Sequence, residues 1–305
     1  MTTASETAGQ HAATQRGLLL VLLAGVCWSS MGLVVRLMEV ATPWQILFYR
    51  SIALAAFLFL VIALRSRGRP FEVYRQAGLS AVLGGLALVA AFSGSIFSIV
   101  NTTVANAMFL FATAPFFAAL LGWVLLRERV RRATWIAMAV GAVGVVIMVG
   151  EGIALGHLLG NVAAVISALG FAFFTIALRW KHRNDMLPAV SLGGLFTTVV
   201  AGTACLVEGE GLALPAHDIG LAVFLGLFQL GLGLSLYTMG AKTVPAAELA
   251  LLSMTEVVLG PVWVWLLLGE SAALATWVGG AILMAAIAGN ALTRLRQRPP
   301  PLVLP

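Results

Sequence analysis

Long apolar stretches alternate with short polar connections along almost the entire chain. Each stretch is close to the ~20 residues that an α-helix needs to cross the hydrocarbon core of a bilayer. The stretches are continuously hydrophobic instead of amphipathic, which is typical of helices that lie in lipid. This pattern predicts ten membrane-spanning helices, at residues 17–38, 43–64, 77–99, 103–126, 132–150, 157–179, 186–207, 217–239, 244–268 and 272–293.

The composition places the chain among all-α integral membrane proteins. Of its 305 residues, 61% are hydrophobic and only 10% are charged, whereas a soluble domain carries about a quarter charged residues. The connections between the spans are too short to hold a soluble catalytic domain. Residues 1–16 form a polar N-terminal tail, and the proline-rich segment 294–305 is expected to be a disordered cytoplasmic tail.

The positions of lysine and arginine predict the orientation of the spans. The basic connections "RSRGRPFEVYR", "RERVRR" and "RWKHRND" fall on one side of the membrane, together with both termini. Because cytoplasmic loops carry an excess of these residues, both termini are predicted to be cytoplasmic. Arg36 and Arg50 are the two exceptions to the pattern. The net charge of +6 therefore reflects membrane topology, and no nucleic-acid partner is expected.

The second half of the chain resembles the first half at an offset of about 142 residues. The segment "TTVANAMFLFATAPFFAALLGWVLLRERVRRATW" lies over "VPAAELALLSMTEVVLGPVWVWLLLGESAALATW", so that Glu128 meets Glu270. One residue further, Arg36 meets Arg179. These matches predict an internal repeat of five spans in each half.

Because five is an odd number, the two copies must cross the membrane in opposite directions. The predicted copies are residues 17–150 and 157–293. Inverted repeats are typical of secondary transporters, in which the substrate site lies near the midplane between the copies. A symmetric bundle with a purely structural role is the alternative interpretation.

The fourth and ninth spans each carry a proline inside an apolar stretch that ends in glutamate, and in this they resemble the EamA family of the drug/metabolite transporter superfamily. The motif runs from Pro115 to Glu128 and recurs from Pro261 to Glu270, although Pro261 lies one helical turn later than exact symmetry requires. The resemblance covers about residues 17–293. It implies a basket-like bundle around a central cavity lined mainly by the first, third, fourth, sixth, eighth and ninth spans. It also implies export of amino acids, related metabolites or drugs across the bacterial inner membrane.

The two prolines are candidate gating residues. Pro115 and Pro261 each remove a backbone donor and would free a carbonyl group one turn earlier in the span. Such interruptions in corresponding spans of two inverted halves indicate a transport site. The alternative is that both are ordinary prolines of membrane helices.

Two glutamates in the ninth span are candidate site residues. Glu256 lies roughly 18 Å into the span, near the midplane, and Glu248 roughly 6 Å into it. An ionisable residue at the depth of Glu256 is a functional hypothesis by default. The alternative is a buried ion pair with Arg50, which lies roughly 10 Å into the second span. Glu248 could instead extend to the cytoplasmic interface, and Arg50 to the outer head groups.

Further polar and aromatic side chains occur at depths where they could line a cavity. They are Trp28, Phe92, Ser95, Asn106, Phe109, Phe171, Gln229, Tyr237 and Ser253. The hydrogen-bonding groups of Asn106, Gln229 and Tyr237 would be costly against lipid. Asn106 and Gln229 could equally serve to bridge neighbouring helices.

Together these features favour a secondary transporter that exports small amphipathic solutes by alternating access, as a monomer or weak homodimer. No cofactor or metal is expected, and coupling to protons is left open. A passive channel or a structural membrane protein is the alternative. An intramembrane enzyme is the least favoured class, because the sequence holds no HExxH motif and no histidine cluster. Phosphorylated solutes are disfavoured because Arg50 would be the only basic residue in the cavity.

Overall fold

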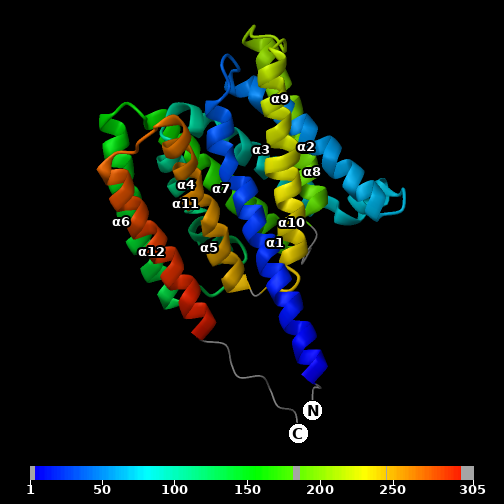
Figure 1. The fold of residues 1–305 in the computed structure, drawn as a ribbon, viewed down its shortest axis with the longest axis vertical. Helices are drawn as coiled ribbons and strands as arrows, with labels where there is room; N and C mark the ends of the chain where they lie inside the picture. Colours follow the sequence, from blue (N-terminus) through cyan, green and yellow to red (C-terminus); the bar gives the residue numbers. More distant parts are fainter. Residues whose placement is uncertain (1–3, 181–185, 245, 297–305) are drawn as a thin grey trace.

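The structure is a computed structural model that describes residues 4–180, 186–244 and 246–296 (Figure 1). Helices are the only regular elements in these residues, and ten spans are long and apolar enough to cross a membrane. The prediction of an all-α, ten-span protein is therefore confirmed. In lipid an isolated backbone has no water to bond to, so each apolar stretch satisfies its own polar groups by forming a helix.

The first five spans are α1 (Ala4–Arg36), α2 (Pro43–Arg65), α3 (Pro70–Asn101), the pair α4 (Val104–Phe111) and α5 (Ala114–Leu125), and α6 (Arg132–Ala154). The second five are α7 (Leu158–Trp180), α8 (Leu187–Val207), the run of α9 (Ala216–Phe224), η1 (Leu225–Leu232) and α10 (Gly233–Gly240), then α11 (Ala246–Leu268) and α12 (Leu274–Arg296).

Both terminal helices extend further than the hydrophobic pattern predicts. α1 begins at Ala4, so most of the predicted polar tail is helical. This tail holds four Ala and two Gln residues, which favour helix without forming a long apolar stretch. α12 continues to Arg296, which corrects the predicted start of disorder at residue 294. The remainder of that predicted tail lies outside the described residues.

The third span also begins earlier than predicted, because a short helical segment precedes the membrane-crossing part. Pro70 stands in the first turn, where its missing N–H costs nothing. Gly78 then adopts φ 61° and ψ −153° and kinks the helix. Glycine is the residue that takes such a conformation without a steric penalty. Seven residues earlier, the side chain of Phe71 is 76% exposed.

The predicted proline interruptions differ between the two halves. The fourth span breaks at Ala112 and Thr113, and Pro115 stands in the first turn of the helix that follows. Pro261 instead lies inside α11, which is continuous from Ala246 to Leu268. In the span before α11, η1 is a π-helix, and such segments occur preferentially at functional sites.

The two halves are interleaved, so that the main helix contacts join one half to the other. α3 packs along α7, α6 along α12, α2 along α8, and α1 along both α10 and α11 (Figure 1). Small residues allow close approach at these contacts. A Cβ atom on Gly94 would lie 2.5 Å from the carbonyl oxygen of Ala163. Close backbone packing of this kind replaces the hydrophobic effect as the force between membrane helices.

The bundle has two ends, which we name by one arginine at each. α1 begins and α12 ends at the same end of the bundle (Figure 1). α7 runs toward that end and has Arg179 in its last turn, so it is called the Arg179 end. α1 terminates at the opposite end with Arg36 in its last turn, and this is the Arg36 end.

Candidate functional site

Four predicted site residues from α1, α10 and α11 lie together, and we call Trp28, Tyr237, Ser253 and Glu256 the Glu256 cluster. The ring centroids of Trp28 and Tyr237 are 5.3 Å apart. The Tyr237 hydroxyl interacts with Ser253 and lies within electrostatic range of Glu256. Gly233 makes room for the indole, because a Cβ there would lie 2.5 Å from the Trp28 Nε1 atom. The cluster therefore combines one carboxyl group with two aromatic walls.

The Glu256 side chain lies on the opposite side of α11 from two exposed residues. It points about 160° away from Val258 and about 180° away from Trp265 around the helix axis. Those two side chains are 52% and 58% exposed. Glu256 itself is partly exposed, although it lies roughly 15 Å from the start of α11. The helix therefore turns Glu256 away from the side that Val258 and Trp265 expose.

Phe171 lies on the side of α7 that packs against other helices, next to the buried residues Ser167 and Phe174. Its side chain is 50% exposed, and it points about 180° away from Val162 and about 160° away from Phe173. Both of those residues are exposed on the outer face of the helix. An aromatic ring that is half exposed on an inward face indicates open volume between the two halves.

Arg50 does not occupy the place that the sequence predicted for it. The side chain is 2% exposed, which excludes extension to the head groups. No ion pair with Glu256 forms, and the guanidinium carbon lies 5.4 Å from the centroid of the Phe92 ring. Its Nε and Nη1 atoms have no hydrogen-bond partner among the described residues. The sequence gives depth in the membrane but not the direction in which α2 turns this side chain.

Four other predicted site residues are used in packing or lie away from the cluster. Phe109 is buried against α12, with its ring 6.0 Å from that of Trp277. The Ser95 hydroxyl donates to the Phe92 carbonyl within its own helix. Gln229 is buried in η1, and its Oε1 atom has no partner among the described residues. Glu248 is partly exposed in the first turn of α11, more than two helical turns from Glu256.

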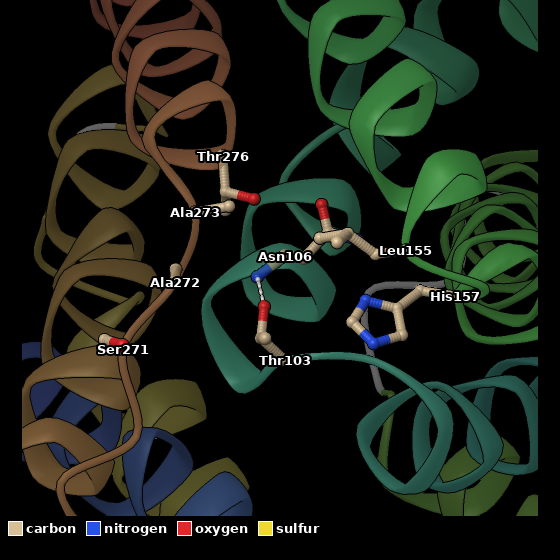
Figure 2. A pocket seen from close by; sticks show the side chains of 8 residues that line it. All are labelled: Thr103, Asn106, Leu155, His157, Ser271, Ala272, Ala273 and Thr276. Carbon is tan, nitrogen blue, oxygen red and sulfur yellow. Dashed lines mark hydrogen bonds between the residues drawn. The ribbon is translucent and has the colours of Figure 1, made fainter.

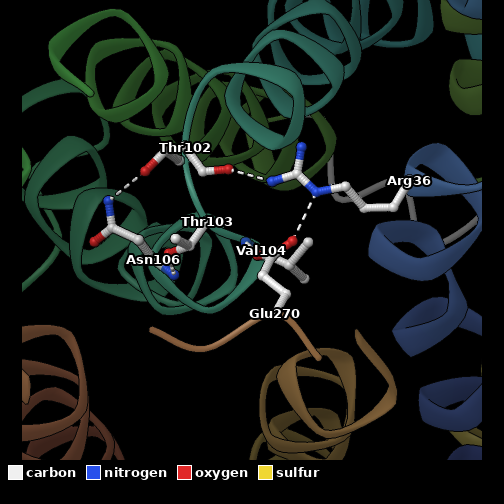
Figure 3. A network of polar contacts seen from close by, with 6 residues as sticks. All are labelled: Arg36, Thr102, Thr103, Val104, Asn106 and Glu270. Atoms are coloured by element: carbon white, nitrogen blue, oxygen red, sulfur yellow. Dashed lines mark hydrogen bonds and ion pairs between the residues drawn. The ribbon is translucent and has the colours of Figure 1, made fainter. Parts of the chain in front are cut away.

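An ion pair joins the two halves at the Arg36 end (Figure 3). The Arg36 Nε atom donates to Glu270 at 2.8 Å, and its Nη2 atom donates to the Thr102 carbonyl at 2.7 Å. The second Glu270 oxygen accepts the N–H of Val104 at 2.7 Å. Val104 is the first residue of α4, so the carboxylate also caps a helix N-terminus, where negative charge is favoured. One glutamate thus connects α1, α4 and the end of α11.

The Arg179 end carries the symmetric counterpart of this pair. The Arg179 Nη2 atom donates to Glu128, which follows the end of α5. Glu128 and Glu270 are 142 residues apart, and Arg36 and Arg179 are 143 apart. Each pair therefore joins the first helix of one half to the fourth span of the other, at opposite ends of the bundle.

The backbone before each glutamate is also the same in the two halves. Arg127 has φ 53° and Gly269 has φ 69°, both in the left-handed region. A non-glycine residue there carries strain of about 1–2 kcal/mol, which persists only where the surroundings fix it. The turn directs Glu128 and Glu270 back across the end of the bundle. The sequence comparison aligns all four charged residues but cannot pair them, because the contact depends on how the halves pack.

A pocket of about 290 Å³ is lined by Thr103 and Ser271, which are next in the chain to Val104 and Glu270 (Figure 2). Figure 2 shows three segments around it: the start of α4 with Thr103 and Asn106, the α11–α12 connection, and the segment between α6 and α7 with His157. The lining residues are Thr103, Asn106, Leu155, His157, Ser271, Ala272, Ala273 and Thr276. Asn106 was predicted as a cavity residue, and it lines this pocket near one end of the bundle.

The sequence model of the EamA-like transporter family matches the chain at residues 15–150 and again at 155–292. The chain belongs to the EamA-like transporter family. The protein is therefore a multi-pass membrane transporter and not an enzyme, and its cargo is a small solute. The double match agrees with the two pairs of symmetric charges at the ends of the bundle.

Individual relatives cover most of this EamA protein. A protein of Helicobacter pylori (strain J99), named as an uncharacterized transporter, is 26% identical over 80% of this chain and 84% of its own length. The pseudopaline exporter CntI of Pseudomonas aeruginosa is 25% identical over 92% of this chain and 97% of its own. A solved crystal structure that is 19% identical has a TM-score of 0.64, covers 95% of this chain, and supports the fold.

Proposed function

We propose that this EamA protein is a secondary transporter that exports small amphipathic metabolites, such as amino acids, or drugs across the bacterial inner membrane by alternating access. The observation that carries the proposal is the pair of symmetric Arg–Glu contacts at opposite ends of the bundle. In a carrier, one end must open while the other is closed. Two equivalent contacts, each joining the two halves, supply two equivalent gates.

The strength of the pairs suits a gate that opens in every cycle. The side chains of Arg36 and Glu270 are 27% and 20% exposed, and those of Arg179 and Glu128 are 46% and 39% exposed. Ion pairs open to solvent contribute only about 0–1 kcal/mol. Each contact can therefore define a closed state without holding it permanently.

The Glu256 cluster supplies the substrate site in this proposal. A carboxylate beside Trp28 and Tyr237 can bind an ammonium group through charge and through the faces of the aromatic rings. The half-exposed Phe171 offers an apolar wall for the rest of the solute. Neutral, zwitterionic or cationic amphipathic solutes fit these groups, whereas a phosphorylated solute would need several basic residues. The broken fourth span at Pro115 and the proline in α11 are proposed as the flexible points of the gates.

Transport by the purified protein is the direct test of this function. Proteoliposomes would be loaded with each of a panel of radiolabelled amino acids and, separately, with ethidium. The expected result is protein-dependent efflux of at least one probe that saturates with concentration and is accelerated by the same unlabelled probe on the opposite side. Efflux that never saturates and shows no such exchange would indicate a channel. No efflux of any probe would contradict the proposed class of solute.

We further propose that both termini and the Arg179 end face the cytoplasm, because the basic connections lie at that end. Single cysteines at Arg67 and Glu210 would be introduced after replacing Cys27 and Cys205, which are both buried. An impermeant thiol reagent added to intact cells should label the Glu210 site and spare the Arg67 site. Labelling of Arg67 but not of Glu210 would reverse the assigned orientation.

A further inference from the structure

A second pocket, of about 660 Å³, lies where the connection between α5 and α6 meets the ends of those two helices. α5 packs along α7 and α6 packs along α12, so the two consecutive helices are held by different neighbours (Figure 1). The residues that give the pocket its chemistry are Trp123 and Val124 of α5, Arg127, Glu128 and Arg129 of the connection, and Trp135 of α6. None of them belongs to the Glu256 cluster or to the pocket at the Arg36 end.

The pocket lies at the level where two membrane spans end. One apolar span finishes at Leu125, and the next begins at Arg132. Trp123 is therefore in the last turn of the first span, and Trp135 is in the first turn of the second. Tryptophan is enriched at such places, where the hydrocarbon meets the head groups. The arginines of the connection are consequently at the depth of the lipid head groups.

The pocket has an apolar wall and a basic wall, and both are open to the surroundings. The rings of Trp123 and Trp135 are 5.3 Å apart between centroids and nearly perpendicular, and both side chains are exposed. Val124 is exposed beside them. Arg127 and Arg129 are also exposed. An apolar surface next to two guanidinium groups matches an amphipathic molecule with an anionic head.

The charges of the lining residues favour an anion. Glu128 is the one carboxylate among the residues that line the pocket, and it is paired with Arg179. Neither Arg127 nor Arg129 forms an ion pair with another described residue. Guanidinium groups bind phosphate oxygens through two parallel hydrogen bonds. A head group of net negative charge is favoured over one in which an ammonium group balances the phosphate.

The basic wall is present in one copy of the repeat only. At the offset of 142 residues, the two tryptophans recur in the second copy as Trp265 and Trp277. The two arginines do not recur, because their counterparts are Gly269 and Ser271. The aromatic residues are thus common to both ends of the bundle, whereas the groups that would bind a phosphate are found at the Arg179 end.

The backbone at Arg127 gives an independent reason to assign a use to its side chain. Arg127 has φ 53° and its counterpart Gly269 has φ 69°, so both lie in the left-handed region. Glycine adopts this conformation without a steric penalty, whereas a residue with a side chain is strained there. The turn itself therefore does not require arginine. Strained residues of this kind are concentrated at sites that hold a ligand.

We propose that this pocket binds the head group of an anionic phospholipid, with the phosphate on Arg127 and Arg129 and the acyl chains along the exposed apolar side chains of Val124 and Ile136. About 660 Å³ lies within the range of small-molecule sites, roughly 300–1,000 Å³, and accommodates one head group. Membrane orientation alone would make every basic connection equivalent. The pocket assigns a bound lipid to this connection, and the assignment does not depend on the proposed transport function.

Native mass spectrometry of the purified protein tests the site directly. The protein would be equilibrated with phosphatidylglycerol or with phosphatidylethanolamine that has the same acyl chains. At equal lipid concentration, at least about threefold more phosphatidylglycerol should remain bound. Arg127→Gly with Arg129→Ser installs the residues of the other copy and should remove this preference. Equal binding of the two lipids by the parent protein would overturn the proposal.

The matched control is Arg67→Gly with Arg69→Ser in the connection between α2 and α3. It removes two arginines with the same spacing, and Arg67 also has a left-handed φ, of 52°. Glycine relieves backbone strain at both left-handed positions, so both double variants should fold. Neither control residue lines the pocket, and the control should keep the preference for phosphatidylglycerol. An equal loss in the two double variants would indicate a general charge effect and refute the site.

A measurement in bilayers does not rely on the arginine variants. In nanodiscs, phosphatidylglycerol that is brominated on its acyl chains should quench tryptophan fluorescence more than equally brominated phosphatidylethanolamine. Trp123→Phe with Trp135→Phe should abolish this difference, and an unchanged difference would place the lipid elsewhere. Glycerol phosphate at the same concentration should not displace phosphatidylglycerol in the mass spectra. Displacement would assign the pocket to a soluble phosphate ester and overturn the lipid site.

Discussion

Glu256→Gln is expected to lower the transport rate by roughly tenfold or more while the protein inserts and accumulates normally. The substitution keeps the size and hydrogen-bonding capacity of the side chain and removes its charge. A hydrogen bond to a charged group is worth about 1.5–3 kcal/mol, and 1.4 kcal/mol corresponds to a factor of ten in affinity. The measurement is efflux from proteoliposomes with the probe that the parent protein exports, at matched protein content.

Glu248→Gln is the matched control for this prediction, since Glu248 lies in the first turn of the same helix, more than two turns from Glu256. It should reduce efflux less than Glu256→Gln does. Wild-type efflux at normal abundance for the Glu256 variant would remove this residue from the mechanism. Poor accumulation of the variant would instead indicate a structural role for the carboxylate.

Reversing one charge of the Arg36–Glu270 pair should also lower transport by roughly tenfold, and reversing both should restore part of it. Like charges placed against each other repel, so the closed state at this end would be depleted in either single variant. The double variant Arg36→Glu with Glu270→Arg re-forms the ion pair. The arginine introduced at position 270 cannot accept the hydrogen bond from the Val104 N–H, so the recovery should be incomplete.

The same design at the other end uses Arg179→Glu with Glu128→Arg, and the measurement is again efflux at matched abundance. Because the two pairs are related by the repeat, each should show loss in the single variants and recovery in the double variant. Additive losses in the double variants, with no recovery at either end, would mean that these contacts do not act as gates. Arg69, whose pair with Glu72 is highly exposed, offers a control position: Arg69→Gln should leave efflux near the parent value.

The spans could be predicted because a long apolar stretch in lipid satisfies its backbone polar groups by forming a helix. The predicted second span at 43–64 and the observed α2 differ by one residue. Prediction failed where helix continues without hydrophobicity, as at the start of α1 and in the segment of α3 before Gly78. Hydropathy does not indicate a polar helix. Such a helix depends on the helix propensity of its residues and on its packing in the fold.

The sequence predicted how deep the candidate site residues lie in the membrane, but not the direction in which their side chains point. Glu256, Trp28, Tyr237 and Ser253 were selected separately for their depth, and the structure places them together. Phe109 was selected on the same grounds, yet it fills the contact between α4 and α12. The sequence also could not predict that the buried Oδ1 atom of Asn106 has no partner among the described residues, because this depends on the folded surroundings of the amide.

The ion pairs at the two ends illustrate what an internal repeat can and cannot reveal. The offset aligns Glu128 with Glu270 and Arg36 with Arg179, so the sequence marks these residues as equivalent. Each bond, however, crosses from one copy to the other. Only the interleaved packing of α1 with α11, and of α5 with α7, brings the partners together.

Alternating access is tested most directly by measuring from which side a cysteine at Phe171 can be reached. In the Cys27→Ala, Cys205→Ala background, Phe171→Cys would be labelled with an impermeant thiol reagent from each side of oriented membrane vesicles. Arg36→Gln, which weakens the contact at its end, should increase labelling from the Arg36 side and decrease it from the other. Arg179→Gln should have the opposite effect. Labelling that is unchanged by both substitutions, or increased from both sides at once, would contradict the account.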